Sequence, residues 1–238
     1  MSGVDAFVVR NQLLARMSGE DRALIAREFE PVELPFRERL ERPDQRIRHA
    51  YFLERGLASV ITASAGEQSE VAVIGCEGMV GFSLVLGVDR TSTETLMQVE
   101  GAAQRIAAAP LIAALAQSAS LTSLLLRYVY VLYMQTAYTA HANAQGTINA
   151  RLARWLLMAH DRLNGDELHL THEFLSIMLG VRRAGVTAAL NQLAEERVIA
   201  TARGHIAVLD RVGLEKSARG LYGAAEAEFD RWVRRNGN

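Results

Sequence analysis

The sequence predicts an α+β protein with three parts in order: a helix and an antiparallel β-roll (jelly roll), one long helix, and a C-terminal pair of helices with a β-hairpin. Three observations lead to this prediction. Residues 31–106 contain short strand-like runs separated by glycines, residues 121–144 form an apolar helical run, and residues 169–209 contain two short helical runs before a hairpin signal. A chain of 238 residues is long enough for one large domain or two ordinary ones.

The first part begins with a helix predicted over residues 7–30, because apolar side chains recur there at helical spacing. From Pro31 onward the pattern changes to short strands. These are predicted over residues 32–34, 51–53, 58–62, 71–74, 95–99 and 104–106, with turns at Gly56, Gly66, Gly75, Gly78, Gly81, Gly87 and Gly101. Since no helices alternate with the strands, an antiparallel barrel or jelly roll is favoured over a parallel sheet.

A short helix over residues 111–116 precedes a long helix predicted over residues 121–144. The long helix is apolar on nearly all sides, so it must be buried on several of them. We expect one of its stripes to pair with the same helix of a second copy, while a core helix of a monomer is the alternative. The expected dimerisation stripe consists of Leu121, Leu125, Tyr128, Leu132, Gln135 and Thr139.

The C-terminal part begins with a helix predicted over residues 148–162, followed by a hairpin turn at Asn164-Gly165 and a strand over residues 167–170. Asp210 is expected to cap a final helical region over residues 211–235. The predicted domains are therefore residues 1–118, with the roll; 119–145, the dimerisation helix; and 146–238.

Residues 169–209 carry the most specific pattern in the chain. Thr171 is placed to cap a first helix, Gly180 ends that helix at a sharp turn, and a second helix starts near Arg182. The second helix buries Val186, Leu190 and Leu193 and presents Arg183, Thr187 and Asn191 on its opposite side. Two short strands around Arg203-Gly204 complete a winged helix-turn-helix.

The alternative is an αα-hairpin with a β-hairpin and no nucleic-acid role. Residues 181–192 contain two arginines and no acidic residue, whereas a merely solvated helix face would mix both signs. Residues 147–238 contain 13 basic and 11 acidic residues against 13 and 16 in the rest, so a net charge of −1 divides into +2 and −3. The sign of this weak asymmetry favours double-stranded DNA as the partner of the C-terminal part.

This order of elements resembles the Crp/Fnr superfamily of bacterial transcription regulators over nearly the whole chain. Besides residues 171–209, the roll carries Tyr51-Phe52 with Gly56 and Leu57–Val60, similar to the family's early hairpin, and Gly75–Gly81, similar to the turn entering its effector pocket. The resemblance implies a cyclic-nucleotide-binding-like sensor roll and a homodimer that reads a roughly palindromic DNA site, with half-sites ~34 Å apart. It also implies RNA polymerase as a further partner.

The resemblance assigns DNA contacts residue by residue. Arg183 takes the place of the family's guanine-reading arginine, and a guanidinium can donate two hydrogen bonds to guanine. The family's glutamate after it is replaced by Ala184, so the preferred DNA sequence should differ. The remaining expected contacts are Arg182, Thr187 and Asn191 on the second helix, Thr171 at the start of the first helix, and Arg203 and His205 in the wing.

The effector pocket that the resemblance implies lacks the charges that bind cyclic AMP. In the family a Gly-Glu pair and, about ten residues later, an Arg-Ser pair hold the ribose and the phosphate; here these positions are Gly81-Phe82 and Ser92-Thr93. Arg90 is the only nearby candidate for a phosphate contact. The pocket residues, which include Ser83, are therefore expected to bind a different small-molecule effector or none.

Other classes of function are disfavoured. One cysteine cannot hold an iron–sulfur cluster or a disulfide framework, and the six histidines are scattered, so no cofactor or metal is expected. No phosphate loop, nucleophile elbow or zinc-protease motif indicates an enzyme. Without an export signal or a long enough apolar run, we expect a soluble cytoplasmic protein with no membrane partner. The alternative function is a ligand-sensing or protein-interaction module whose winged helix does not bind DNA.

Overall fold

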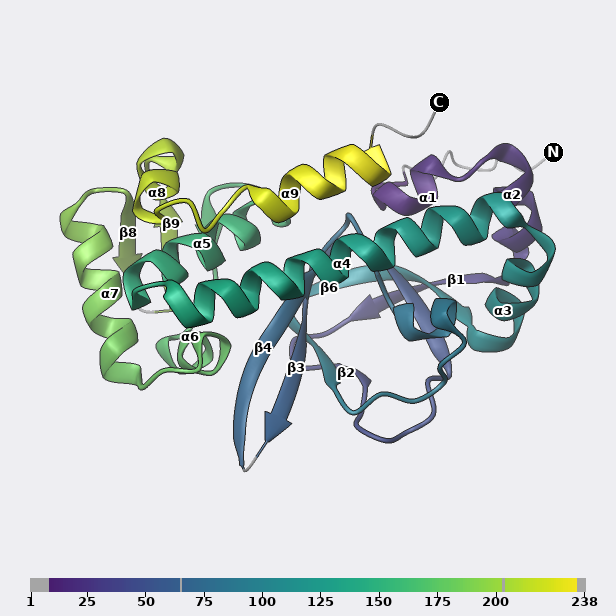
Figure 1. The fold of residues 1–238 in the computed structure, drawn as a ribbon, viewed down its shortest axis with the longest axis horizontal. Coiled ribbons are helices and arrows are strands. Elements are labelled where there is room, and N and C mark those ends of the chain that lie inside the picture. The colour runs from purple at the N-terminus through teal and green to yellow at the C-terminus, as the bar shows by residue number, and fades with distance from the viewer. Residues whose placement is uncertain (1–8, 65, 203, 235–238) are drawn as a thin grey trace.

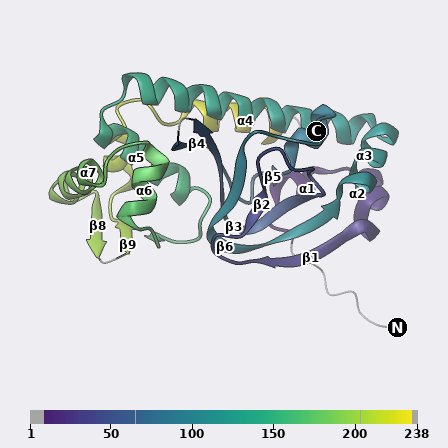
Figure 2. The ribbon, with the colours of Figure 1, turned by 90° about the horizontal axis from the view of Figure 1, so that it is seen from below.

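The computed structural model describes residues 9–64, 66–202 and 204–234. The β-roll and the C-terminal helices occupy the two ends of an elongated molecule, and the long helix α4 (Ala119–Gln145) runs along both of them (Figure 1). The second view shows α4 lying across one side of the roll and of the C-terminal part alike (Figure 2). The predicted α+β class and order of parts are confirmed.

The roll is an antiparallel sheet, as predicted, with the strand order β1-β6-β3-β4; β2 also pairs with β6 and β5 with β3. Its strands are β1 (Phe29–Leu34), β2 (Arg39–Glu41), β3 (His49–Ser64), β4 (Glu67–Ile74), β5 (Met79–Val80) and β6 (Glu94–Ala107). The prediction missed β2 and β5. It also divided β3 and β6 into two short strands each, where the structure has one long strand.

Two glycines explain this error, because they lie inside the long strands instead of between short ones. Gly56 of β3 has a φ of +89°, and the β3–β6 register shifts on either side of it. Gly101 of β6 approaches so closely that a Cβ there would lie 1.9 Å from the Arg55 carbonyl oxygen. The glycines therefore permit a bulge in a continuous strand pair.

The N-terminal helix predicted over residues 7–30 is also wrong in extent. The described part forms two short helices, α1 (Gln12–Arg16) and α2 (Gly19–Ile25), then a 3-10 turn, η1 (Ala26–Glu28), before Phe29 enters β1. The Ser18 hydroxyl accepts a hydrogen bond from the Asp21 N–H at 3.0 Å. An N-cap at this position starts a new helix, so the described residues do not form the single helix that the apolar spacing predicted.

After the 3-10 helix η2 (Phe82–Leu86) and strand β6, the helix α3 (Ala108–Gln117) turns into α4, which Ser118 caps. Among the described residues, no single helix is long and apolar enough to cross a membrane. Only α3 and α4 taken together reach that length and composition, and they are bent by 115° relative to each other.

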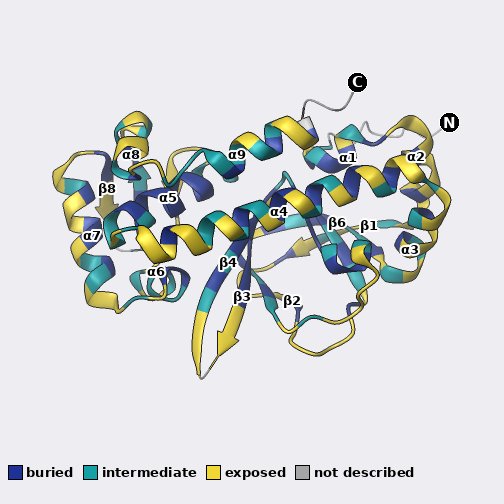
Figure 3. Cartoon of the chain, viewed as in Figure 1, coloured by how far each residue is buried: buried dark blue, intermediate teal, exposed yellow. Residues whose placement is uncertain are grey.

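Five of the six residues of the dimerisation stripe predicted on α4 are buried within this chain, and Figure 3 shows buried and exposed residues alternating along α4. Leu121 and Leu125 are fully buried, and the Gln135 amide donates to the Val73 carbonyl oxygen and accepts from the Val73 N–H. Tyr128 and Leu132 are buried as well, and Thr139 is half-buried and accepts a hydrogen bond from Arg154. These six residues pack against the roll or the C-terminal part, so they do not present a face to a second copy.

The C-terminal part consists of α5 (Ile148–His160), β7 (Glu167–Leu168), α6 (His172–Leu179), α7 (Arg183–Glu195), β8 (Ile199–Ala202), β9 (His205–Val208), α8 (Arg211–Ser217), α9 (Ala224–Phe229) and the π-helical turn η3 (Asp230–Arg234). Asp210 caps α8 as predicted. The helical region expected over residues 211–235 is interrupted, because Arg219 and Gly220 have positive φ values of 51° and 80°. The Asn164-Gly165 turn joins α5 to β7 and does not join two strands.

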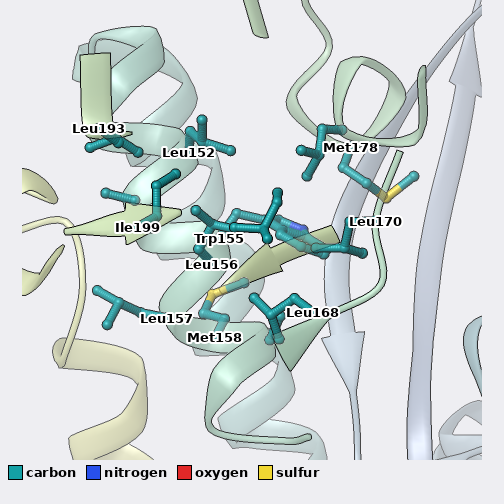
Figure 4. Packing of buried hydrophobic residues seen from close by; sticks show 14 of the residues in the cluster. Leu152, Trp155, Leu156, Leu157, Met158, Leu168, Leu170, Met178, Leu193 and Ile199 are labelled. Atoms are coloured by element: carbon teal, nitrogen blue, oxygen red, sulfur yellow. The ribbon is translucent and has the colours of Figure 1, made fainter. Parts of the chain in front are cut away.

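The hydrophobic packing crosses the predicted domain boundaries. Leu57, Ile61 and Val73 of the roll belong to the same cluster as the core of the C-terminal part, whose centre is α5 (Figure 4). Near the C-terminal end of the described chain, Phe229 and Val233 pack in a cluster with residues of α1 and α4. The division at residues 118 and 145 stays a prediction, because the parts share their cores.

Candidate nucleic-acid interface

The helix-turn-helix predicted from the sequence is present, with its capping residues in the expected roles. The Thr171 hydroxyl accepts a hydrogen bond from the Phe174 N–H at 3.1 Å, which starts α6. Gly180 has a φ of +58°, and its N–H donates to the Ile177 carbonyl oxygen at 3.1 Å, which ends α6. Because only glycine adopts this left-handed conformation without strain, the sharp turn into α7 is encoded at this residue.

Helix α7 packs on α5 through the residues that the sequence assigned to its inner side. Val186, Leu190 and Leu193 are each at most 1% exposed. They share a cluster with Leu152, Trp155 and Leu156 of α5 (Figure 4 shows these three with Leu193). This packing fixes the rotation of α7 about its axis and therefore decides which side chains it presents to solvent.

The solvent side of α7 carries its positive charge at the N-terminal end. Arg182, Arg183, Ala184 and Asn191 are exposed. Within the described part of the chain, no hydrogen bond or ion pair engages either arginine side chain. The unpaired N–H groups of a helix start add a partial positive charge at the same place. The end of α7 thus combines two uncommitted guanidiniums with a helix N-terminus, a combination suited to phosphate and base contacts.

Thr187 differs from the expectation, since it is half-buried and already engaged. Its hydroxyl lies 3.1 Å from Nδ1 of His172 on α6 and donates to the Arg183 carbonyl oxygen at 3.1 Å. The contact ties the two helices together. His172 and Thr187 are fifteen residues apart on opposite sides of the turn, so helical periodicity cannot reveal the pair.

The wing forms as predicted, with β8 and β9 pairing antiparallel from Ile199–Val208 to Ala202–His205 and β7 adding to the other edge of β9. His205 is exposed and packs edge-to-face on His169, with ring centroids 4.4 Å apart. Arg203, the other predicted wing contact, lies outside the described residues. The wing therefore places one predicted phosphate donor, His205, at the surface.

Arg151 of α5 stabilises the C-terminal end of α6 in the helix-turn-helix. Its guanidinium donates to the Leu179 carbonyl oxygen, at the last residue of α6, and its Nε atom is buried without a partner in the described structure. Burial lowers the pKa of Arg151. A cation at a helix C-terminus is favourable to the helix dipole. The sequence shows Arg151 only as a residue of the α5 run, so this role depends on tertiary structure.

The helix-turn-helix is docked onto the roll through a buried carboxyl group. Glu70 of β4 accepts hydrogen bonds from the Ser59 hydroxyl and from Nε1 of Trp155 on α5, the latter at 2.5 Å. Burial raises the pKa of Glu70 to about 7, against the opposing effect of these hydrogen bonds. Nearby, the Gln98 amide lies 3.9 Å from the Met178 sulfur of α6. Strands β3, β4 and β6 therefore contact the helix-turn-helix part directly.

The six residues expected around an effector differ in how far they are buried. Gly81 and Ser83 are buried at the start of η2, whereas Arg90 and Ser92 are exposed and Thr93 hydrogen-bonds to Thr91. Two cavities, of about 300 and 430 Å³, are lined by none of the six. Arg90 instead donates to the Asp44 carbonyl oxygen at 2.9 Å, so its guanidinium holds a neighbouring loop.

Phe82 occupies the position where the resemblance places the ribose-binding glutamate. Its ring packs against the apolar cluster of the roll that contains Leu53, Val60 and Met97. An aromatic ring in this place fills space with apolar atoms and offers no acceptor for a hydroxyl group. The substitution thus supports the inference that the roll does not hold cyclic AMP in the family's manner.

Metal ligands are not clustered in the part of the chain that the structure describes: no group of three or more His, Cys, Asp or Glu side chains is placed to hold an ion. Cys76 is half-buried, and burial, followed by the charge of Glu77, raises the pKa of its thiol. A raised pKa keeps the thiol protonated and therefore poorly nucleophilic.

Comparison with known proteins agrees with the geometry. A profile of the Crp-like helix-turn-helix domain matches residues 150–217, the segment from α5 through α8. No curated protein matches the sequence significantly. Among solved structures, a Crp/Fnr family regulator from Eubacterium rectale has a TM-score of 0.69 and 16% identity, covering 87% of this chain and 98% of that one.

Two further structures have the same fold. A Crp family transcriptional regulator from Thermus thermophilus has a TM-score of 0.67 and 21% identity, covering 81% of this chain and 99% of its own. FixK2 from Bradyrhizobium japonicum has a TM-score of 0.69 and 15% identity, covering 82% and 98%. At these identities the structures establish a shared fold, and the domain match establishes the type of helix-turn-helix. The chain thus carries a Crp-like helix-turn-helix domain at residues 150–217 and shares its fold, over more than four fifths of its length, with structures of Crp/Fnr family regulators.

Proposed function

We propose that this protein is a homodimeric regulator that reads a roughly palindromic DNA site with two copies of α7. The observation that carries the proposal is the N-terminal end of α7, where Arg182 and Arg183 are exposed and uncommitted on a helix whose rotation is fixed by its buried side. A guanidinium there can donate two hydrogen bonds to guanine in the major groove. Ala184 beside it adds a small apolar surface suited to a thymine methyl group.

Substitution of Arg183 tests the base-reading role. A DNA site is first obtained by selection with the full-length protein, and binding is then measured by fluorescence anisotropy. Arg183→Ala should weaken binding to the selected site by about 1–3 kcal/mol and relax the preference at one base position in each half-site. Arg22→Ala removes an equal charge from the exposed face of α2 and should leave both quantities unchanged. If Arg183→Ala leaves the base preference intact, Arg183 does not read a base; if the wild type binds no duplex in a salt-dependent way, the winged helix serves another purpose.

Dimerisation is proposed through a different stripe of α4 from the one that the sequence suggested. Leu126 and Tyr130 are each 42% exposed and Tyr133 is 66% exposed. Together with exposed Ala137, Ala140 and Ala144 they recur at alternating steps of four and three. This spacing is that of a two-helix coiled-coil seam, and the alanines allow the C-terminal halves of two helices to approach closely. A second copy of α4 would cover the apolar side chains that one chain leaves in solvent.

Charge placed in the exposed stripe should separate the subunits. The double variant Leu126→Glu, Tyr133→Glu should sediment as a folded monomer in analytical ultracentrifugation, because two carboxylates would be buried at the seam. Ala113→Glu, on the exposed side of α3, is the control that should remain dimeric. A double variant that stays dimeric at the same concentration would place the interface elsewhere.

A further inference from the structure

A chain of two hydrogen bonds joins the start of α6 to the start of α7. Nδ1 of His172, the first residue of α6, lies 3.1 Å from the Thr187 hydroxyl, and this hydroxyl donates to the carbonyl oxygen of Arg183, the first residue of α7, at 3.1 Å. Within the described residues, no other side-chain hydrogen bond connects the two helices. The chain of bonds therefore ends on the backbone of the residue to which the proposed function gives base reading.

Only one placement of the hydrogen atoms satisfies both bonds. The Arg183 carbonyl oxygen can only accept, so it takes the single proton of the Thr187 hydroxyl. The hydroxyl oxygen then accepts from Nδ1 of His172, which must carry a hydrogen atom. In the neutral ring Nε2 is consequently the nitrogen without one. The bonds thus run from His172 through Thr187 to Arg183, and they select one tautomer of the imidazole.

The first turn of α7 has few other interactions that hold it in place. Arg182 occupies the N-cap position, but its side chain makes no capping hydrogen bond of the kind that Ser, Thr, Asp or Asn makes. Arg183 and Ala184 are exposed, and Gly185 has no side chain and disfavours helix. Val186 is therefore the first residue of α7 with a buried side chain. The link to α6 supplies a constraint that capping and packing do not supply at this turn.

Base reading needs this constraint more than phosphate binding does. A guanidinium that donates two hydrogen bonds to guanine must lie in line with the edge of the base. A phosphate contact is mainly electrostatic, and a cation with more freedom retains most of it. Freedom in the first turn of α7 would therefore reduce the discrimination between DNA sequences more than the affinity for non-specific DNA.

We propose that His172 is a positioning residue for Arg183. Through Thr187 it holds the first turn of α7 against the start of α6, and so it fixes the direction in which the Arg183 guanidinium enters the major groove. In this role His172 acts without contact to a base. The role rests on the base reading proposed for Arg183, whereas the tautomer of His172 does not.

The tautomer is tested without DNA by long-range proton–nitrogen NMR of the histidine rings in the full-length protein. The His172 signals are assigned by their loss in His172→Ala, at a pH where the ring is neutral. Nδ1 is expected to carry the hydrogen atom in the wild type. In Thr187→Val, which keeps the shape of the side chain and removes the hydroxyl, the ring should shift toward the Nε2–H form that predominates in free histidine. A wild-type ring protonated at Nε2 would overturn the chain of bonds and the positioning role.

Base discrimination is measured by fluorescence anisotropy, as the ratio of the affinities for the selected site and for a duplex changed at the base pair that Arg183 reads. His172→Ala and Thr187→Val should each lower this ratio about fivefold, a loss within the range found for coupled residues. The double variant should lower it no further than either single variant, because the same chain of bonds is broken. The affinity for non-specific duplex should stay within about twofold of the wild type.

Two further variants separate positioning from a general structural role. His172→Asn keeps an N–H donor in the place of Nδ1, so its ratio should stay close to that of the wild type. Ser176→Ala removes a hydroxyl whose hydrogen bond, 2.6 Å to the Glu173 carbonyl oxygen, stays within α6, and it should leave the ratio unchanged. Equal losses in His172→Asn and His172→Ala would overturn the role of the donor.

Additive losses in the double variant, or equal losses for specific and non-specific duplex, would also overturn the positioning role. In those cases His172 would act independently of Thr187 or on the fold as a whole, and Arg183 would still be a base reader if Arg183→Ala relaxes the base preference. A wild type that binds no duplex in a salt-dependent way refutes the proposed function and the positioning role together, while the tautomer remains measurable. The two failures are therefore distinguishable.

Discussion

The buried carboxyl of Glu70 makes the stability of this protein depend on pH in a direction that its sequence does not reveal. Glu70 is 4% exposed and lies where β4 of the roll meets Trp155 of α5. Burial raises its pKa from 4.5 to about 7, so the folded protein favours the protonated form. The stabilisation is therefore fully present below about pH 4.5 and is lost as the pH rises through about 7.

The size of the effect follows from the shift. A difference of about 2.5 pKa units corresponds to about 3 kcal/mol between the two protonation states, since one unit is about 1.4 kcal/mol. Glu70→Gln removes the titration. The glutamine amide can still accept from Trp155 or Ser59, so the variant should lose little of the packing at the joint.

Urea unfolding of the wild type and the variant, measured from about pH 5 to about pH 8, gives the difference in unfolding free energy at each pH. The difference should move in favour of Glu70→Gln by about 2–3 kcal/mol across this window, mostly below pH 7. Glu67→Gln, an exposed position on the same strand, should follow the wild type at every pH. Parallel curves for wild type and Glu70→Gln would refute the buried, neutral carboxyl, because every other titrating group cancels in the difference.

Two further predictions concern the fold. Leu125→Ala should lower the unfolding free energy by about 2–5 kcal/mol in chemical denaturation, because Leu125 is fully buried within one chain. If the variant keeps its stability and dissociates into monomers, Leu125 belongs to the dimer seam instead. Gly101→Ala should lower the unfolding free energy by about 3 kcal/mol or more, because the new Cβ would lie 1.9 Å from the Arg55 carbonyl oxygen. Gly19→Ala is the control: no atom lies within 4 Å of its new Cβ, so its unfolding free energy should be unchanged or slightly raised.

The helix-turn-helix was predictable because local rules determine it. A threonine cap, a glycine in the left-handed region and helical spacing of apolar residues are all expressed within about twenty consecutive positions. Thr171, Gly180 and Val186 therefore hold the positions that their residue types indicated. In the same way Asp210 marks a helix start that the structure retains.

The features that the sequence did not predict correctly have a common cause: they depend on packing between residues that are far apart in the sequence. The apolar stripe Leu121–Gln135 does mark a buried side of α4, but periodicity cannot say whether the roll or a second chain buries it. Gly56 and Gly101 signal unusual backbone geometry correctly, yet a turn and a bulge use the same residue. The cavity of about 300 Å³ could not be predicted either, because its lining residues lie between positions 12 and 230 and come together only when α9 folds back onto α4.

Strand β4 contacts both α4 and α5, so it is one of the connections between the roll and the helix-turn-helix part. On one side Gln135 of α4 holds both backbone groups of Val73, with distances of 2.7 and 3.2 Å. On the other side Glu70, three residues earlier, holds Trp155 of α5. A movement of β4 must either break the two hydrogen bonds of Gln135 or carry α4 with it. A displacement relative to α5 must leave the Glu70 carboxyl or the Trp155 N–H buried without a partner, at a cost of about 1–3 kcal/mol. Because α7 packs on α5, we expect a movement of the roll that preserves these bonds to carry the arginine end of α7 with it.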